Sequence, residues 1–260
     1  MTDTTAPDLP AWPYPRWVAH RGAGKLAPEN TLAAFRLGAQ HGYRMFECDA
    51  KLSSDGVVFL MHDATLQRTT NARERIGAGH SAVGGDHPWH TLSQLDAGGW
   101  HSRAYAGEPL PTLEAVASFC IRNGYFLNIE IKPTPGTERH TGEAVAHEAA
   151  RLWQSQSVQP LLTSFQPEAL MGAQESAPAL PRGLLLDSLW TGWLECALTL
   201  GCQAIVCNYA LWDESTVRQA QSAGFRTLSY TVNDEWVAER LIALGTDGII
   251  TDRVDLFTPA

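Results

Sequence analysis

The 260-residue sequence predicts an α/β fold, a (β/α)8 TIM barrel with a small insertion after its second strand. Eight short apolar segments recur along the chain, and amphipathic helical patterns separate most of them. Several helical patterns end at a glycine, which readily takes the left-handed conformation of a helix C-terminus. Each apolar segment runs into a polar residue at its C-terminal end, as at the rim where barrel enzymes build their sites. An open doubly wound sheet is the alternative, because periodicity does not demonstrate closure.

The first two strands are expected at residues 17 to 20 and 44 to 50. The other six are expected at 126 to 131, 160 to 164, 182 to 186, 203 to 207, 225 to 231 and 247 to 251. The expected helix stops are Gly42, Gly124, Gly201, Gly224 and Gly245. The polar residues at the strand ends are His20, Asp49, Lys132, Ser164, Asp187, Asn208, Asn233 and Asp252.

One connection between the expected strands is unusually long. Residues 63 to about 111 are rich in glycine, histidine and tryptophan, and they form a connection far longer than the ~2–6 residues of an ordinary βα loop. The aromatic residues Trp89, Trp100 and Tyr105 favour an ordered segment over a disordered excursion. We therefore expect one barrel domain over residues 1–260, with this insertion covering the site.

Composition narrows the range of partners. The formal charge is −9, and no block of lysine or arginine occurs, which argues against nucleic acid or an anionic membrane as the main partner. No stretch approaches the ~20 apolar residues that span a bilayer, and the proline-rich first fifteen residues do not resemble a secretory signal. Five cysteines without CxxC spacing are typical of reduced core residues. We expect a soluble cytoplasmic protein with no stable membrane association.

Two of the expected strands carry charge on one face. In "MFECDAKL", Glu47 and Asp49 are two residues apart and share a face, and in "FLNIEIKP" the same holds for Glu130 and Lys132. A solvent-facing strand would explain this pattern in an antiparallel sheet. In a parallel barrel the outer face packs on helices, so the charged face must point inward, where unpaired charge is costly.

The three carboxylates of Glu47, Asp49 and Glu130 therefore need neutralising charge, and Arg21 with Lys132 offers at most two positive groups. Three carboxylates form a hard oxygen set that suits Mg²⁺ or Ca²⁺, and the sequence does not choose between these ions.

His20 ends the first strand, and His62 follows the apolar segment "VVFLM". A lone histidine after an apolar run is more often structural, but two beside a metal site suit an acid and a base. Arg21 and Lys132 suit an anionic oxygen such as a phosphate oxygen, although either could instead pair with a carboxylate. In "PENTLAAF", Pro28 and Asn30 suit the start of a helix.

Together, "HRGAGKLAPENTLAAF", "ECDAKLSSDGVVFLMHDATLQRTTN", "NIEIKP", "YTVND" and "GIITD" resemble the glycerophosphodiester phosphodiesterase family, from about Trp12 to Phe257. The resemblance is greatest to its bacterial cytosolic branch associated with glycerol 3-phosphate uptake. It implies a barrel enzyme that hydrolyses glycerophosphocholine, glycerophosphoethanolamine and similar small molecules to sn-glycerol 3-phosphate and an alcohol. The glycerol 2-hydroxyl would be the first nucleophile.

The resemblance also implies roles for particular residues. His20 and His62 would be the general acid/base pair, Glu47, Asp49 and Glu130 would bind one divalent cation, and Arg21 and Lys132 would contact the phosphate. Trp236 could border the substrate pocket, although a core position is an equal alternative. One departure is visible: "RTTN" is followed by "ARERIGAGHSAVGGDHPW" rather than directly by glycine, which affects the insertion and the expected selectivity for the alcohol.

Two other functions remain open. A phospholipase-type barrel acting on intact lipid would need a membrane-facing apolar or basic rim, and none is evident. A binding protein that holds a phosphorylated ligand without turnover is disfavoured, because the five proposed catalytic and metal positions all carry competent residues.

Overall fold

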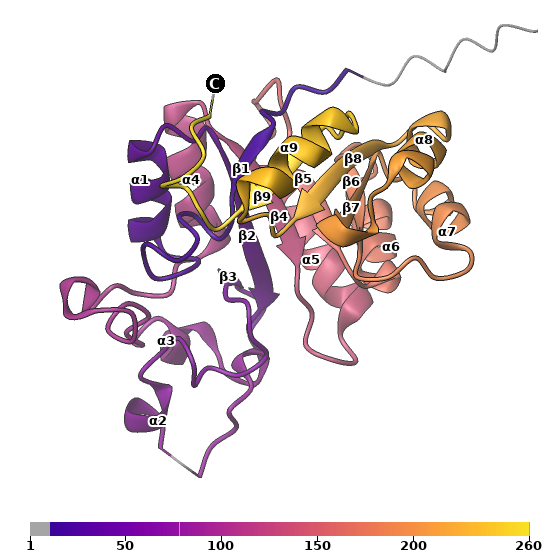
Figure 1. Ribbon diagram of the computed structural model, residues 1–260. Helices are drawn as coiled ribbons and strands as arrows, with labels where there is room; N and C mark the ends of the chain where they lie inside the picture. Colours follow the sequence, from indigo (N-terminus) through magenta and orange to yellow (C-terminus); the bar gives the residue numbers. More distant parts are fainter. Residues whose placement is uncertain (1–10, 78, 260) are drawn as a thin grey trace, which may run out of the picture.

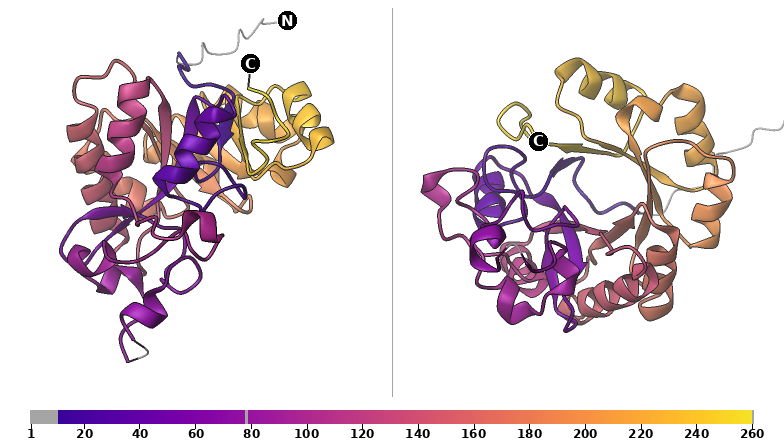
Figure 2. Two further views of the ribbon diagram at one scale, coloured as in Figure 1. Left: turned by 90° about the vertical axis from the view of Figure 1, so that its left-hand side faces the viewer. Right: turned by 90° about the horizontal axis from the view of Figure 1, so that it is seen from below.

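The computed structural model describes residues 11–77 and 79–259, which form a closed parallel barrel surrounded by helices (Figures 1 and 2). Its barrel strands are β1 (Trp17–Ala19), β2 (Met45–Leu52), β4 (Phe126–Ile131), β5 (Leu161–Ser164), β6 (Arg182–Leu186), β7 (Ala204–Asn208), β8 (Arg226–Tyr230) and β9 (Gly248–Thr251). They pair in parallel in the order β1-β9-β8-β7-β6-β5-β4-β2, and a further pairing of β1 with β2 closes the ring. The barrel and its eight strands are confirmed.

The sequence did not predict one additional strand. β3 (Val58–Leu60) runs antiparallel to the end of β2, with Leu60 opposite Ala50 and Val58 opposite Leu52. The sequence predicts no strand in the apolar segment "VVFLM" that precedes His62. A three-residue strand is too short for a period of two to show in the sequence.

Seven helices cover the outside of the barrel. They are α1 (Leu32–Gln40), α4 (Leu113–Asn123), α5 (Glu138–Leu152), α6 (Pro167–Ser176), α7 (Trp193–Thr199), α8 (Glu214–Ser222) and α9 (Glu235–Ala243), and the 3₁₀ turn η3 (Tyr209–Leu211) follows β7. All five glycines expected to stop helices lie one or two residues beyond a helix end and have positive φ. The helical pattern and its glycine stops are therefore confirmed.

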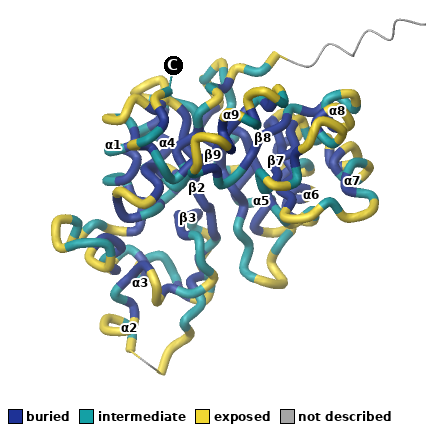
Figure 3. The backbone as a smooth tube through the Cα atoms, in the orientation of Figure 1, coloured by how far each residue is buried: buried dark blue, intermediate teal, exposed yellow. Residues whose placement is uncertain are grey.

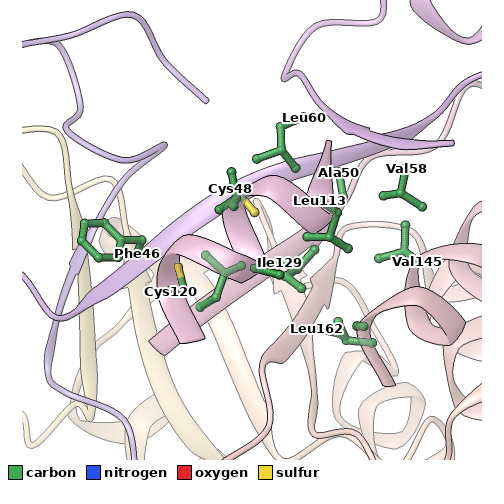
Figure 4. Packing of buried hydrophobic residues seen from close by; sticks show 14 of the residues in the cluster. Phe46, Cys48, Ala50, Val58, Leu60, Leu113, Cys120, Ile129, Val145 and Leu162 are labelled. Atoms are coloured by element: carbon green, nitrogen blue, oxygen red, sulfur yellow. The ribbon is translucent and has the colours of Figure 1, made fainter. Parts of the chain in front are cut away.

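The packing of the core explains why two strands carry charge on one face only. On the outer face, Phe46 and Cys48 of β2 pack with Leu113 and Cys120 of α4 (Figure 4). Inside the barrel, a separate apolar cluster includes Val18, Met45, Leu161, Val206 and Ile250. Figure 3 shows the strands as the most continuously buried part of the chain. The polar residues are left for the carboxyl ends of the strands, where the barrel opens.

The insertion is ordered over its described residues. It contains α2 (Ala72–Arg75), η1 (Gly84–Asp86), α3 (Trp89–Leu92) and η2 (Arg103–Tyr105), and it projects from the barrel below β3 in Figure 1. It has a small core of its own, in which Leu66, Leu92 and Leu95 pack with Phe59 and Met61. Across the described chain, no helix is both long enough and apolar enough to cross a membrane.

Candidate active site

The three acidic residues predicted to bind a cation lie side by side on β2 and β4. The strand register places Asp49 beside Glu130 and Glu47 beside Asn128. Glu47, Asp49 and Glu130 are all buried, and each offers a carboxylate oxygen within 4.8 Å of the other two. Among the described residues, Glu47 Oε1 and Asp49 Oδ1 have no hydrogen-bond partner.

These carboxylates fit a hard cation. Burial, followed by repulsion from neighbouring carboxylates, raises the pKa of Glu47 well above its usual value and that of Glu130 to about 7. Burial also opposes ionisation of Asp49, but nearby positive charge, chiefly Arg21, leaves its pKa below the usual value. Crowded acidic oxygens without hydrogen-bond partners form the ligand set that Mg²⁺ and Ca²⁺ prefer.

Arg21 and Lys132 approach this cluster from two sides. Arg21 Nε lies 3.2 Å from Asp49 Oδ2, and Lys132 Nζ lies 3.0 Å from Glu130 Oε1. Arg21 has a left-handed backbone, with φ 51°, and its amide donates to Glu47 Oε2 over 3.0 Å. The first βα loop therefore supplies the cluster with both a guanidinium group and a backbone amide.

The two histidines flank the cluster, and each is oriented by an aspartate. His20 Nδ1 lies 2.6 Å from Asp252 Oδ1, and His20 Nε2 faces Glu47 Oε2 at 3.8 Å. Although burial alone would raise it, hydrogen bonds from His20 and Asn233 hold the pKa of Asp252 at about 2. Asp252 therefore remains an anion at neutral pH.

His62 has a different electrostatic environment. Its Nδ1 lies 2.8 Å from Asp63 Oδ1, and its Nε2 lies 3.1 Å from Lys132 Nζ. A lysine ammonium can only donate, so Nε2 accepts and the imidazole proton resides on Nδ1. Burial lowers the pKa of His62, which agrees with a neutral ring.

Comparison with known proteins identifies the family. A model described as the glycerophosphoryl diester phosphodiesterase family matches residues 20–256. The chain belongs to this family. A glycerophosphodiester phosphodiesterase from Caldanaerobacter subterraneus is 32% identical over 240 residues, which cover 90% of this chain and 93% of the relative. One from Bacillus subtilis is 31% identical over 255 residues, which cover 92% and 84%.

A solved structure supports the same family. An Oleispira antarctica phosphodiesterase in complex with the product sn-glycerol-3-phosphate superimposes with a TM-score of 0.82 at 32% identity, covering 92% of this chain and 93% of the other. The chain is thus an enzyme that hydrolyses glycerophosphodiesters. Both the family and the activity expected from the sequence are confirmed.

Sequence reasoning missed several residues that hold the phosphodiesterase site together. Asp252 was recognised only as a polar strand end, and Asp63, the neighbour of His62, was not considered. Asn30 was expected at a helix start, which is wrong: Thr31 caps α1, with its hydroxyl accepting from the amide of Ala34. Asn30 instead has φ 60° and forms two hydrogen bonds with Asp49, one from its side-chain amide and one to its side-chain oxygen.

Three cavities adjoin the site. A central one of about 180 Å³ is lined by both histidines and also by Phe165 and Tyr230. A second of about 480 Å³ lies on the side of His62, and a third of about 420 Å³ lies on the side of His20. Trp236 lines none of the three: it lies in the first turn of α9 and is 66% exposed. Its expected substrate contact stays a prediction.

Proposed function

We propose that the enzyme converts glycerophosphodiesters to sn-glycerol 3-phosphate and an alcohol in a metal-dependent reaction, with His20 and His62 transferring the protons. The observation that carries this proposal is the arrangement of the two histidines, which flank one cluster of buried carboxylates and are each held by an aspartate. The product complex of the Oleispira relative supports glycerol 3-phosphate as the product.

In this proposal Glu47, Asp49 and Glu130 would hold one divalent cation, either Mg²⁺ or Ca²⁺. When bound, such an ion supplies positive charge that neutralises the carboxylates and stabilises negative charge on phosphate oxygens. Arg21 and Lys132 border the same cluster and would donate hydrogen bonds to the phosphate, which lowers the cost of charge developing there.

We infer the roles of the two histidines from their surroundings. His62 Nε2 already accepts a hydrogen bond, so we infer that His62 is the base that takes the proton of the glycerol 2-hydroxyl. His20 lies between the carboxylates of Asp252 and Glu47, which suits a ring that carries a proton on Nε2. We infer that His20 gives this proton to the departing alcohol.

In this proposal the reaction proceeds in two steps. The glycerol O2 forms a bond to phosphorus while the bond from phosphorus to the alcohol oxygen breaks, which leaves a cyclic phosphate. Water opens this ring in the second step: His20 takes a proton from the water, and His62 returns its proton to O2, so both histidines regain their starting states.

The cavities suggest where the substrate lies. The central cavity is small and has Phe165 and Tyr230 in its wall, which suits the carbon face of glycerol. Trp236, at the start of the helix after β8, is proposed to border the outer part of the substrate path. The proposal treats residues 1–260 as one catalytic domain, with the insertion at about 63–111 beside the site; the single sheet that holds all nine strands supports this.

The proposal also keeps a cytoplasmic location and a small-molecule substrate, with neither nucleic acid nor a stable membrane contact. All five cysteines, Cys48, Cys120, Cys196, Cys202 and Cys207, are free, and a reducing compartment would keep them so.

The deciding experiment measures glycerol 3-phosphate release from glycerophosphocholine with Mg²⁺, with Ca²⁺ and with excess EDTA. Release should require a divalent cation, and His20→Ala and His62→Ala should each reduce turnover by at least about 100-fold. Cation binding, followed by calorimetry, should persist in both variants. Metal-independent release, or near-normal turnover in either variant, would contradict the proposed mechanism. Ligand binding without release would indicate a binding protein.

A further inference from the structure

Arg68, in the insertion, binds two carboxylates at once. Its Nε donates to Asp63 Oδ2 over 2.6 Å and its Nη2 to Asp63 Oδ1 over 2.9 Å. On its other edge, Nη1 donates to Glu29 Oε2 over 2.8 Å and Nη2 to Glu29 Oε1 over 2.7 Å. Both contacts are bidentate, which is the geometry that a planar guanidinium makes with carboxylates.

Each of these carboxylates also holds a residue of the proposed site. Asp63 accepts from Nδ1 of His62, and Glu29 accepts from Nη1 of Arg21 over 3.0 Å. One hydrogen-bonded chain therefore runs from His62 through Asp63, Arg68 and Glu29 to Arg21. It joins the histidine on one side of the acidic cluster to the guanidinium on the other.

Arg68 keeps the carboxylate beside His62 ionised. The hydrogen bonds from Arg68, more than any other interaction, hold the pKa of Asp63 well below its usual range, so the partner of His62 stays an anion. The Arg68 side chain is 44% exposed, and its guanidinium lies over the Trp100 ring, 5.9 Å from the ring centre. Trp100 belongs to the same insertion, so its ring packs against the guanidinium while Asp63 and Glu29 bind it.

We propose that Arg68 is a positioning residue of the phosphodiesterase, which sets both the orientation of the His62 ring and the placement of Arg21 by clamping Asp63 and Glu29 together. The inference rests on the roles proposed above for His62 and Arg21. The insertion would then contribute to the reaction, because it carries the residue that couples the base to the phosphate-binding arginine.

Replacing Arg68 should therefore affect two kinetic parameters. In Arg68→Gln, Asp63 loses its partner and no longer fixes His62, so kcat should fall; Glu29 is released, Arg21 is less well placed, and KM should rise. Removing an orienting partner of this kind typically costs about 10–100-fold in activity. Arg68→Lys should recover only part of this loss, because a lysine cannot form two bidentate contacts.

A spectroscopic measurement separates positioning from general stability. The ¹⁵N chemical shifts of His62 report which ring nitrogen carries the proton, and in the native enzyme they should show the Nδ1–H tautomer. In Arg68→Gln, where Lys132 still donates to Nε2, the tautomer should persist, but the Nδ1 resonance should shift and broaden as the contact with Asp63 loosens. Thermal unfolding and circular dichroism should show that the fold is kept. The losses in Arg68→Gln and Asp63→Asn should also combine non-additively, because the two residues act through the same ring.

Arg139→Gln is the matched control. Arg139 of α5 is similarly exposed and also bonds both oxygens of one carboxylate, that of Glu175 on α6, away from the site. It should leave kcat, KM and the Nδ1 resonance of His62 unchanged. Unchanged kinetics and an unchanged Nδ1 resonance of His62 in Arg68→Gln, while His62→Ala is inactive, would overturn this inference alone. Normal turnover in His62→Ala would instead overturn the proposed mechanism on which it rests.

Discussion

Residues with an unusual backbone conformation gather at the site. Among the described residues, the two non-glycine residues with positive φ are Arg21 and Asn30, which border the first βα loop. Asparagine tolerates this region, but an arginine there is uncommon, and such conformations cost of order 1–3 kcal/mol. Both residues use the conformation to bond the acidic cluster, Arg21 through its amide and Asn30 through its side chain. The local strain is thus offset by contacts that organise the site.

The environment of His62 predicts a pH dependence. Burial lowers its pKa below the ordinary value of about 6.5. A base must be neutral, and the neutral ring predominates above its pKa, so the acidic limb of kcat/KM should lie below pH 6.5. The profile is measured between about pH 4 and 8 at saturating cation.

The neighbouring aspartate provides a check on this assignment. The hydrogen bond to Asp63 raises the pKa of His62, so Asp63→Asn should move the limb to still lower pH while reducing the rate. An acidic limb at or above pH 6.5 in the native enzyme, or a shift to higher pH in the variant, would be inconsistent with His62 as the base.

At the scale of elements, the outer helices approach closely where glycine permits it. A Cβ atom at Gly142 of α5 would overlap the carbonyl oxygen of Ala169 in α6, and one at Gly172 of α6 would overlap the carbonyl oxygen of Arg139 in α5. The two helices therefore pack backbone against backbone, side by side on the outside of the barrel (Figure 1). Their contact supports β4 and β5 from outside and does not include the proposed catalytic groups.

Gly142→Ala should therefore destabilise the fold without impairing the chemistry. Overpacking costs about 1–3 kcal/mol, which should exceed the roughly 1 kcal/mol that alanine gains over glycine in a helix. Urea denaturation measures the free energy of unfolding, and kcat at a permissive temperature should stay near normal. His147→Ala, an exposed change in the same helix, is the control and should be nearly neutral. Equal stability of the two variants would show that the helices can separate without cost.

At the scale of the whole molecule, barrel closure assembles the site from distant parts of the chain. His20 and Asp252 are 232 positions apart, and the pairing of β1 with β9 brings them together. The acidic cluster comes from β2 and β4, while Asp63 and Arg68 come from the insertion. Folding therefore gathers buried negative charge whose mutual repulsion opposes the native state.

A divalent cation should stabilise the whole fold. An ion that binds only the native state at 100 times its dissociation constant adds about 2.7 kcal/mol, so Mg²⁺ or Ca²⁺ should raise the Tm relative to EDTA. Glu130→Gln should lose most of this rise, and Glu175→Gln, an exposed carboxylate on α6, should keep it. Differential scanning calorimetry supplies a readout independent of activity. If neither ion raised the Tm of the native protein, the cluster would not be a cation site.

The sequence by itself determined the eight barrel strands, the helix stops and the acidic, basic and histidine residues that meet at the rim. Local periodicity encodes these features, since a period of two puts Glu47 and Asp49 on one face and a parallel barrel turns that face inward. Only the tertiary structure decided which residues contact these site residues. Asp252, Asn30, Asp63 and Arg68 join the site through closure, left-handed turns and a folded insertion. No periodic pattern encodes such contacts, because they depend on where distant segments meet in space.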